Sequence, residues 1–249
     1  DTVHDIQVWN EPNLQNEWAG QKVNPAQYAD MLHVAADRAR AIDPNVVILA
    51  ASLAPNVEPG PSGGTDNMSD LLYLQRLYQA QGSPYFDVVV ANPYGLQYSP
   101  AADRSIGFHS YQFPRAALRP PESFDFSRPI AMRAIMERNG DEGKPIWAGE
   151  FGWNTVPKDW QGNKSPWKSV TVQQQALFTA EAFQRARAEW PWMGVMNVWY
   201  LREPVDTDPR DPTPYFAIVH QDWSTTPAYK AIQALAAQPS RDSTGVNPA

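Results

Sequence analysis

Apolar runs and stretches with helical spacing alternate along the whole chain. Continuous apolar runs at 46–51, 86–91 and 193–200 are typical of strands that are buried on both faces. Elsewhere apolar residues recur at the spacing of a helix face, which predicts helices over residues 27–41, 69–81, 127–139, 171–190 and 226–237. Because strands and helices alternate, the pattern predicts an α/β fold in which helices cover a parallel sheet.

Two further short runs each end in a glutamate. Residues 5–13 read Asp-Ile-Gln-Val-Trp-Asn-Glu-Pro-Asn, and the proline after Glu11 is expected to end the strand because it lacks a backbone N–H. Residues 144–153 read Lys-Pro-Ile-Trp-Ala-Gly-Glu-Phe-Gly-Trp, and the glycines near Glu150 give the backbone room to turn. Parallel α/β folds carry their chemistry at the C-terminal ends of strands, so Glu11 and Glu150 are the candidate catalytic groups.

A pair of isolated carboxylates suits cleavage of a glycosidic bond, in which one protonates the leaving oxygen and the other attacks the sugar or activates water. Asn10-Glu11-Pro12 resembles the acid/base motif of the clan of TIM-barrel retaining glycoside hydrolases that includes cellulases, β-mannanases, β-xylosidases and β-glucosidases. Residues 147–152, Trp-Ala-Gly-Glu-Phe-Gly, resemble the nucleophile strand of that clan. A lone buried glutamate is more often a satisfied ion pair, but two such strand ends in the clan's order and spacing favour catalysis.

The resemblance implies a double-displacement mechanism without a metal or cofactor. Glu150 would attack the anomeric carbon, and Glu11 would protonate the leaving sugar and then deprotonate the incoming water. In retaining enzymes the two carboxyl groups stand roughly 5 Å apart. The two roles require a raised pKa for Glu11 and an ionised Glu150.

The same resemblance implies several contacts with substrate. Asn10 matches the clan's asparagine that binds the sugar 2-hydroxyl, although a strand-end asparagine also caps loops. Tyr94 matches a tyrosine that binds the nucleophile, and Trp199 matches the tryptophan beneath the attacked sugar. Asn92 falls where many relatives carry histidine, which leaves the polar contacts at this edge open.

Three more tryptophans have two possible roles. Trp153, Trp160 and Trp167 could line the sugar-binding site or pack in the core. Of the three, Trp153 is the one predicted to bind substrate. Ten Trp and ten Tyr are many for 249 residues, and flat aromatic rings suit the C–H faces of sugars. Relatives also place an Arg and other sugar contacts on their early strands, and the chain has no counterpart of these.

The number of strands limits the resemblance. The chain predicts about five βα units, whereas a TIM barrel has eight. Glu11 and Glu150 match the ends of the clan's fourth and seventh strands, so we expect an α/β fold of the (β/α)8 TIM-barrel type with only about strands 4–8 present. Residues 1–238 would form this partial catalytic barrel, 96–125 a loop over the site, and 239–249 a flexible tail.

A partial barrel would leave strand edges uncovered. The leading hypothesis is a fragment whose missing strands come from another chain or from a missing N-terminal segment. The alternative is a smaller sheet that stands alone and dimerises through its open edges.

Composition and charge restrict the partners. The net charge of −7 argues against nucleic acid or an anionic membrane, and no apolar run is long enough to span a bilayer. The start of the chain shows no signal peptide, and the absence of cysteine excludes disulfides and thiolate metal sites. The four histidines lack ligand spacing, which disfavours a metal-dependent hydrolase. Because large glycans are usually met outside the cell, we expect an extracellular or cell-surface protein.

Two functions remain open. The first is a retaining β-glycoside hydrolase that cleaves β-linked oligo- or polysaccharides. The alternative is a non-catalytic carbohydrate-binding or structural subunit that keeps a glycosidase-like fold, which the missing strands favour and the two glutamates disfavour.

Overall fold

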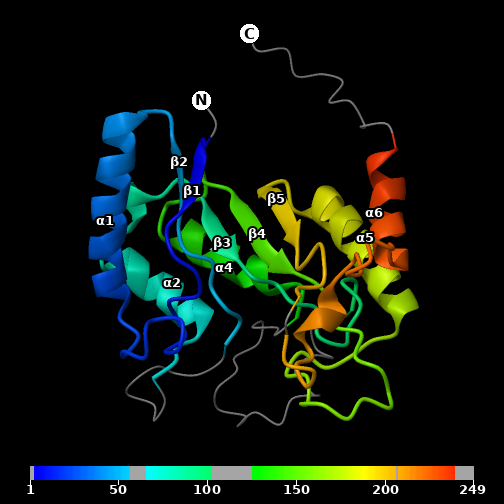
Figure 1. Cartoon of the computed structure of the whole chain (residues 1–249). Coiled ribbons are helices and arrows are strands. Elements are labelled where there is room, and N and C mark those ends of the chain that lie inside the picture. The colour runs from blue at the N-terminus through cyan, green and yellow to red at the C-terminus, as the bar shows by residue number, and fades with distance from the viewer. Residues whose placement is uncertain (1–2, 57–65, 103–124, 206, 239–249) are drawn as a thin grey trace.

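The computed structural model describes residues 3–56, 66–102, 125–205 and 207–238 (Figure 1). Within these residues, five strands alternate with five α-helices and two short 3-10 helices. The strands are β1 Asp5–Gln7, β2 Val47–Leu49, β3 Val89–Ala91, β4 Ile146–Phe151 and β5 Met193–Val198. The helices are α1 Pro25–Ile42, α2 Asp70–Gln79, η2 Ser83–Tyr85, α4 Arg128–Arg138, α5 Val172–Glu189, η3 Thr213–Phe216 and α6 Pro227–Ala236.

The strands form two parallel sheets that are joined at their neighbouring edges. One sheet pairs β1 with β2, and the other has the order β3-β4-β5. Backbone hydrogen bonds join the two, with Ala50 N 3.0 Å from Val88 O and Leu53 N 3.3 Å from Val90 O. The five strands therefore run side by side in chain order, and the predicted α/β class with a parallel arrangement is confirmed.

The predicted helices agree closely with those observed because their ends carry strong local signals. Helix α1 begins at Pro25, and the Asn24 side chain accepts hydrogen bonds from the backbone N–H groups of Ala26 and Gln27. Helix α5 begins after Thr171, which forms a reciprocal capping box with Gln174. The strands are shorter than the apolar runs, with β2 at Val47–Leu49 and β3 at Val89–Ala91.

The strand that leads to Glu11 ends earlier than predicted. Strand β1 stops at Gln7, and the backbone of Trp9 and of Glu11 then takes positive φ angles of 77° and 45°. Such angles break the extended conformation before Pro12 is reached. The Glu11 N–H nevertheless donates to Ser52 O at 2.9 Å, so Glu11 stays attached to the end of β2.

Helices α1 and α2 lie on one side of the molecule and α5 and α6 on the other, with α4 behind β3 and β4 (Figure 1). One hydrophobic core packs α1 and α2 against the first strands. A second core packs Phe178 of α5 together with Phe126 and Phe151. Between α2 and α4, Arg128 and Asp70 form a fully buried ion pair.

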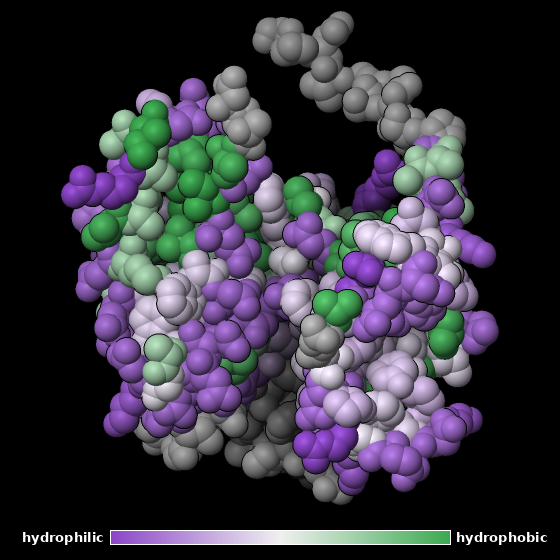
Figure 2. Space-filling view, viewed as in Figure 1, coloured by the Kyte–Doolittle hydropathy of each residue, from purple (hydrophilic) through white to green (hydrophobic). Residues whose placement is uncertain are grey.

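The outermost strands remain uncovered. Ile6 of β1 and Val195 of β5 are exposed, and Val3 and Ile42 add apolar surface beside β1. Figure 2 shows this hydrophobic area on the side of the molecule that carries β1 and α1. No described helix combines the length and the apolar character needed to cross a bilayer. Most of the predicted loop 96–125 and the predicted tail 239–249 lie outside the described residues.

Candidate active site

The candidate residues come from four strands that point the same way. Asn10 and Glu11 follow β1, Asn92 and Tyr94 follow β3, and Glu150 lies near the end of β4. Because parallel strands end at the same edge of a sheet, their C-terminal ends bring these side chains together. Trp199 directly follows β5 at the same edge.

One short segment holds both glutamates. The Asn92 side-chain amide donates from Nδ2 to Glu11 Oε1 at 2.6 Å. Two residues later, the Tyr94 hydroxyl donates to Glu150 Oε2, also at 2.6 Å. Each carboxylate therefore has its own donor, and both donors stand on the same turn after β3.

Burial controls the proton affinity of Glu11. Loss of contact with water raises the pKa of Glu11 from its ordinary 4.5 to about 7, the Asn92 hydrogen bond opposes this rise, and the charges of Glu150 and Glu17 add to it. The influence of Glu150 places the two carboxylates within electrostatic reach of each other. Within the described residues, Glu11 has no cationic partner.

Burial and a hydrogen bond also act on Glu150, with opposite effects on its pKa. Burial raises the pKa of Glu150, the hydrogen bond from Tyr94 lowers it, and the charge of Glu17 raises it. Burial and the carboxylate of Glu150 also raise the pKa of Tyr94, which keeps its hydroxyl protonated and able to donate.

Glycine 149 permits the close approach of β4 to this turn. A Cβ on Gly149 would lie 2.7 Å from Val90 Cγ1 and 3.0 Å from Asn92 Oδ1. The sequence predicted that glycine here gives the backbone room to turn, whereas the structure shows that it leaves room for neighbouring side chains. Asn92 is only 2% exposed, and its Oδ1 has no partner among the described residues.

The remaining polar candidate lies at the rim. Asn10 is exposed, and its Oδ1 accepts a hydrogen bond of 2.5 Å from Ser52 Oγ. The Asn10 amide nitrogen points away from that contact, so Ser52 fixes the orientation of the side chain beside Glu11.

Two of the predicted tryptophans lie near the carboxylates. Trp199 is partly exposed, and its backbone N–H donates to Phe151 O at 2.8 Å, next to Glu150. The ring of Trp167 lies 6.1 Å from that of Tyr94 and 5.3 Å from that of Phe216. Trp167 therefore stands beside the tyrosine that holds Glu150.

Trp153 occupies a different environment. Its side chain is 1% exposed and packs against Phe126, Phe151 and Phe178 in the second core. Its indole N–H donates to Tyr98 O at 2.8 Å. The structure thus gives Trp153 a packing role beneath the site, because the ring has no free face to offer a sugar.

Sequence reasoning missed Glu17. Its charge raises the pKa of both Glu11 and Glu150, so this third carboxylate stands near the pair. No motif marks Glu17, since it lies on an irregular loop after β1. Among the described residues, no group of three or more His, Cys, Asp or Glu side chains has the geometry to hold a metal ion.

No family model and no curated protein matches this chain. Solved structures do resemble it at low sequence identity. The chain superposes with a TM-score of 0.55 on a GH128 exo-β-1,3-glucanase from Aureobasidium namibiae, at 12% identity, and covers 93% of itself and 68% of that chain. For an α-L-arabinofuranosidase from Thermotoga maritima the TM-score is 0.56 at 11% identity, with 91% and 38% covered.

A GH2 β-galacturonidase from Eisenbergiella tayi gives a TM-score of 0.50 at 14% identity, with 93% and 33% of the two chains covered. The chain therefore spans about two-thirds of the glucanase but little more than a third of the other two. These comparisons support a fold like that of TIM-barrel glycosidases.

Proposed function

We propose that this chain is the catalytic part of a retaining β-glycoside hydrolase that acts on β-linked oligo- or polysaccharides. The observation that carries the proposal is the pair of partly buried glutamates, which have no cationic partner among the described residues and are each held by their own donor from the Asn92–Tyr94 segment. The glycosidase-like fold supports the reaction class.

In the first step Glu150 attacks the anomeric carbon as an ionised nucleophile. A bond forms between its carboxylate oxygen and that carbon, while the bond to the leaving oxygen breaks. Glu11 transfers its proton to the leaving oxygen. The raised pKa of Glu11, about 7, supports this role because the group keeps its proton in mildly acidic to neutral solution.

In the second step a water attacks the same carbon. Glu11, now ionised, takes the proton of that water, and the bond to Glu150 breaks to release the free carboxylate. Tyr94 supports both steps, since its hydrogen bond to Glu150 favours the ionised form. Two successive inversions retain the configuration of the sugar.

Aromatic side chains support a glycan as the substrate. Trp167 lies beside Tyr94, and the partly exposed Trp199 follows β5 at the same edge as Glu150. Faces of aromatic rings bind the C–H faces of sugars while hydroxyl groups reach polar side chains. We propose that Asn10, at the rim beside Glu11, contacts a hydroxyl of the attacked sugar.

The exposed outer strands support a larger barrel. We propose that further βα units, in the same polypeptide or in another chain, pair with β1 and β5 and cover Ile6 and Val195. Size measurement of the purified 249-residue chain tests this. A stable, folded monomer of this chain alone would contradict it.

The experiment that tests the function is hydrolysis of a panel of aryl β-glycosides and soluble β-glucans, with the product anomer followed by NMR. We expect the β-anomer to appear first and Glu150→Gln to lower the rate by about 10³-fold or more. Initial release of the α-anomer would contradict a retaining mechanism.

The carbohydrate-binding alternative predicts a different result. In that case wild type and Glu150→Gln are equally inert on every substrate while both still bind sugar. The observation that favours this alternative is the five-stranded arrangement, in which β1 and β5 have no further strand beside them among the described residues.

A further inference from the structure

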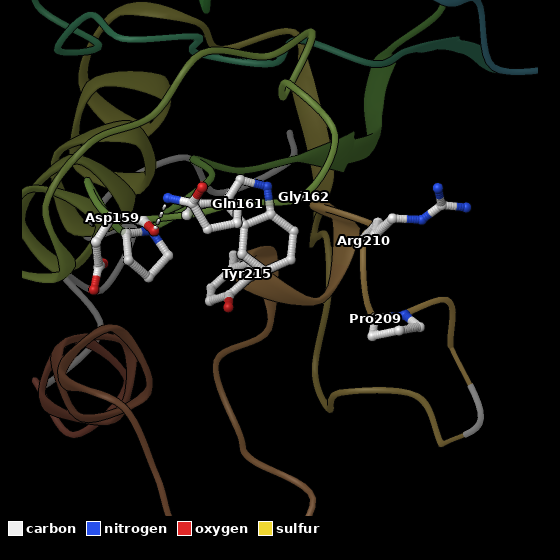
Figure 3. Close-up of a pocket in the computed structure, with 8 residues that line it drawn as sticks. Asp159, Gln161, Gly162, Pro209, Arg210 and Tyr215 are labelled. Carbon is white, nitrogen blue, oxygen red and sulfur yellow. Dashed lines mark hydrogen bonds between the residues drawn. The ribbon is translucent and has the colours of Figure 1, made fainter.

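A concave site lies apart from the two glutamates. It has a volume of about 410 Å³ and lies between residues 157–162, in the loop after β4, and residues 209–215, in the segment after β5 (Figure 3). Small-molecule sites in proteins begin at about 300 Å³. Both walls follow strands at the edge of the sheet that carries Glu150.

The two walls are fixed to each other by hydrogen bonds. The backbone N–H of Asn163 donates to Arg210 O at 2.8 Å, and that of Thr155 donates to Tyr215 O at 3.0 Å. The buried Asn154 side chain donates to Pro212 O at 2.8 Å. The pocket is therefore formed before any ligand arrives, which lowers the entropy cost of binding.

The floor of the pocket is aromatic. The rings of Trp160 and Tyr215 meet edge to face with centroids 5.1 Å apart. The Trp160 indole N–H donates to Asn163 O at 2.9 Å, which fixes the orientation of the ring. Gly162 packs on the same ring, since a Cβ there would lie 2.1 Å from Cζ2.

Polar side chains surround these rings. Figure 3 shows Asp159 and Arg210 at opposite ends of the pocket, with Tyr215 and Gly162 between them. Arg210 is paired with the exposed Asp208 at 3.3 Å, and Asp159 adds a second carboxylate, so the pocket has no excess of positive charge to attract a phosphate or other strong anion. The exposed Asp159 and Gln161 add hydrogen-bonding groups, which a hydrocarbon ligand would leave unpaired.

The pocket is linked to the candidate active site through a buried side chain. Phe216 follows Tyr215 in the chain, and its ring lies 5.5 Å from that of Tyr94, the donor to Glu150. The pocket and Glu150 also share the edge of the sheet at which β4 and β5 end. A glycan that reaches both would run along this edge.

We propose that the Trp160–Tyr215 pocket binds an uncharged sugar unit of the glycan, away from the bond that is cleaved. The sugar stacks its C–H face on the aromatic floor and forms hydrogen bonds with Asp159, Gln161 and Arg210. The choice of a glycan as the ligand rests on the proposed function. Binding at this pocket, however, does not require that the chain hydrolyses the glycan.

Binding to soluble β-1,3-glucan, arabinan and agar oligosaccharides, measured by affinity electrophoresis and calorimetry, tests the pocket. The full chain carries Glu150→Gln throughout, so that no probe is consumed. We expect Trp160→Ala to weaken binding of at least one glycan by about tenfold and Trp160→Phe to restore most of it. The control is Trp223→Ala, because Trp223 is 67% exposed, lies outside the pocket and stacks only on Arg202 among the described residues.

A second variant protects the test against misfolding. Asp159→Ala combined with Gln161→Ala changes two exposed side chains, and we expect it to weaken binding several-fold without altering the thermal unfolding midpoint. Equal binding by this variant, Trp160→Ala and the Trp223→Ala control, or no binding of any of the three glycans, would overturn the inference.

Failure of the proposed function gives a separate signature. If glycan binding depends on Trp160 but the protein with Glu150 restored hydrolyses no substrate, the pocket proposal is supported and the glycosidase proposal is contradicted. If hydrolysis depends on Glu150 but glycan binding does not depend on Trp160, only the pocket proposal is contradicted.

Discussion

Carboxylates that are largely removed from water occur in two regions of this molecule. In one region the carboxylate binds a cation, and in the other the carboxylates accept hydrogen bonds from neutral groups. Between α2 and α4, Asp70 is 1% exposed and accepts two hydrogen bonds from Arg128, at 2.9 and 2.5 Å. At the edge of the sheet, Glu11 and Glu150 are also largely removed from water, but among the described residues only the neutral groups of Asn92 and Tyr94 donate to them.

The difference separates an ion pair that joins two helices from two carboxylates that we propose to act in catalysis. The Arg128 guanidinium neutralises Asp70 and ties two helices together. At the other site two carboxylates lie without a cation among the described residues. Burial, and to a smaller extent the charge of Glu150, raises the pKa of Glu11, so ionisation of Glu11 costs stability.

The largest effect on stability is expected at the paired site. Asp70→Asn removes the carboxylate of the buried Arg128–Asp70 ion pair, and breaking such a pair typically costs about 3–5 kcal/mol. We expect urea unfolding to show this loss, with the activity per folded molecule unchanged. The control is Glu137→Gln, which removes the exposed partner of Arg133 and should cost less than about 1 kcal/mol. Equal losses in the two variants would contradict the comparison.

At the candidate active site, removal of a carboxylate is expected to raise the free energy of unfolding instead of lowering it. The pKa of Glu11 in the folded protein, about 7, lies above its ordinary 4.5, so the folded chain holds this proton more tightly than the unfolded chain does. Stability therefore falls as pH rises from about 4.5 to 7. Glu11→Gln removes the ionisation of this side chain. We expect the substitution to raise the free energy of unfolding at pH 8 by at most about 3 kcal/mol, the free energy that corresponds to the difference between the two pKa values.

At pH 4 the same variant should match wild type, because Glu11 is then protonated in both states. Denaturant unfolding at the two pH values measures the difference. A stabilisation that does not change with pH would show that the charge of Glu11 is not the cause.

The two donors should act on different limbs of the pH profile. Asn92→Leu removes the bond that lowers the pKa of Glu11, so the basic limb of kcat/KM should move to higher pH by about one unit. Tyr94→Phe removes the bond that lowers the pKa of Glu150, so the acidic limb should move to higher pH instead. If both variants move the same limb, the assignment of one donor to each glutamate is wrong.

The smallest effect is expected from Glu17. Its charge raises the pKa of both glutamates, so Glu17→Gln should move both limbs to lower pH by a few tenths of a unit. Because Glu17 is exposed, about 1 M salt should remove most of this shift. A shift confined to one limb would place Glu17 beside one glutamate only.

Local signals explain which parts of the fold the sequence predicts. Helices α1 and α5 carry Asn24 and Thr171 as caps, and both were predicted to within two residues. The early end of β1 was not predictable, since positive φ at Trp9 and Glu11 is rare for residues with a side chain.

The candidate site shows the same limit. Glu11 and Glu150 stand out because each ends a short strand, but the bond from Asn92 to Glu11 spans 81 positions and leaves no trace in the local pattern. Trp153 and Trp167 look alike in the sequence. Packing alone separates them, as Trp153 is enclosed by the second core while Trp167 lies against Tyr94.

The most direct test of the central claim is rescue by azide of Glu11→Ala and Glu150→Ala on an activated aryl β-glycoside, with the product configuration read by NMR. If Glu150 is the nucleophile, azide replaces it on the opposite face and Glu150→Ala yields the α-glycosyl azide. If Glu11 is the acid/base, azide attacks the glycosyl-enzyme and Glu11→Ala yields the β-glycosyl azide. Reversed configurations would exchange the two roles, and the absence of rescue in both variants would contradict the account.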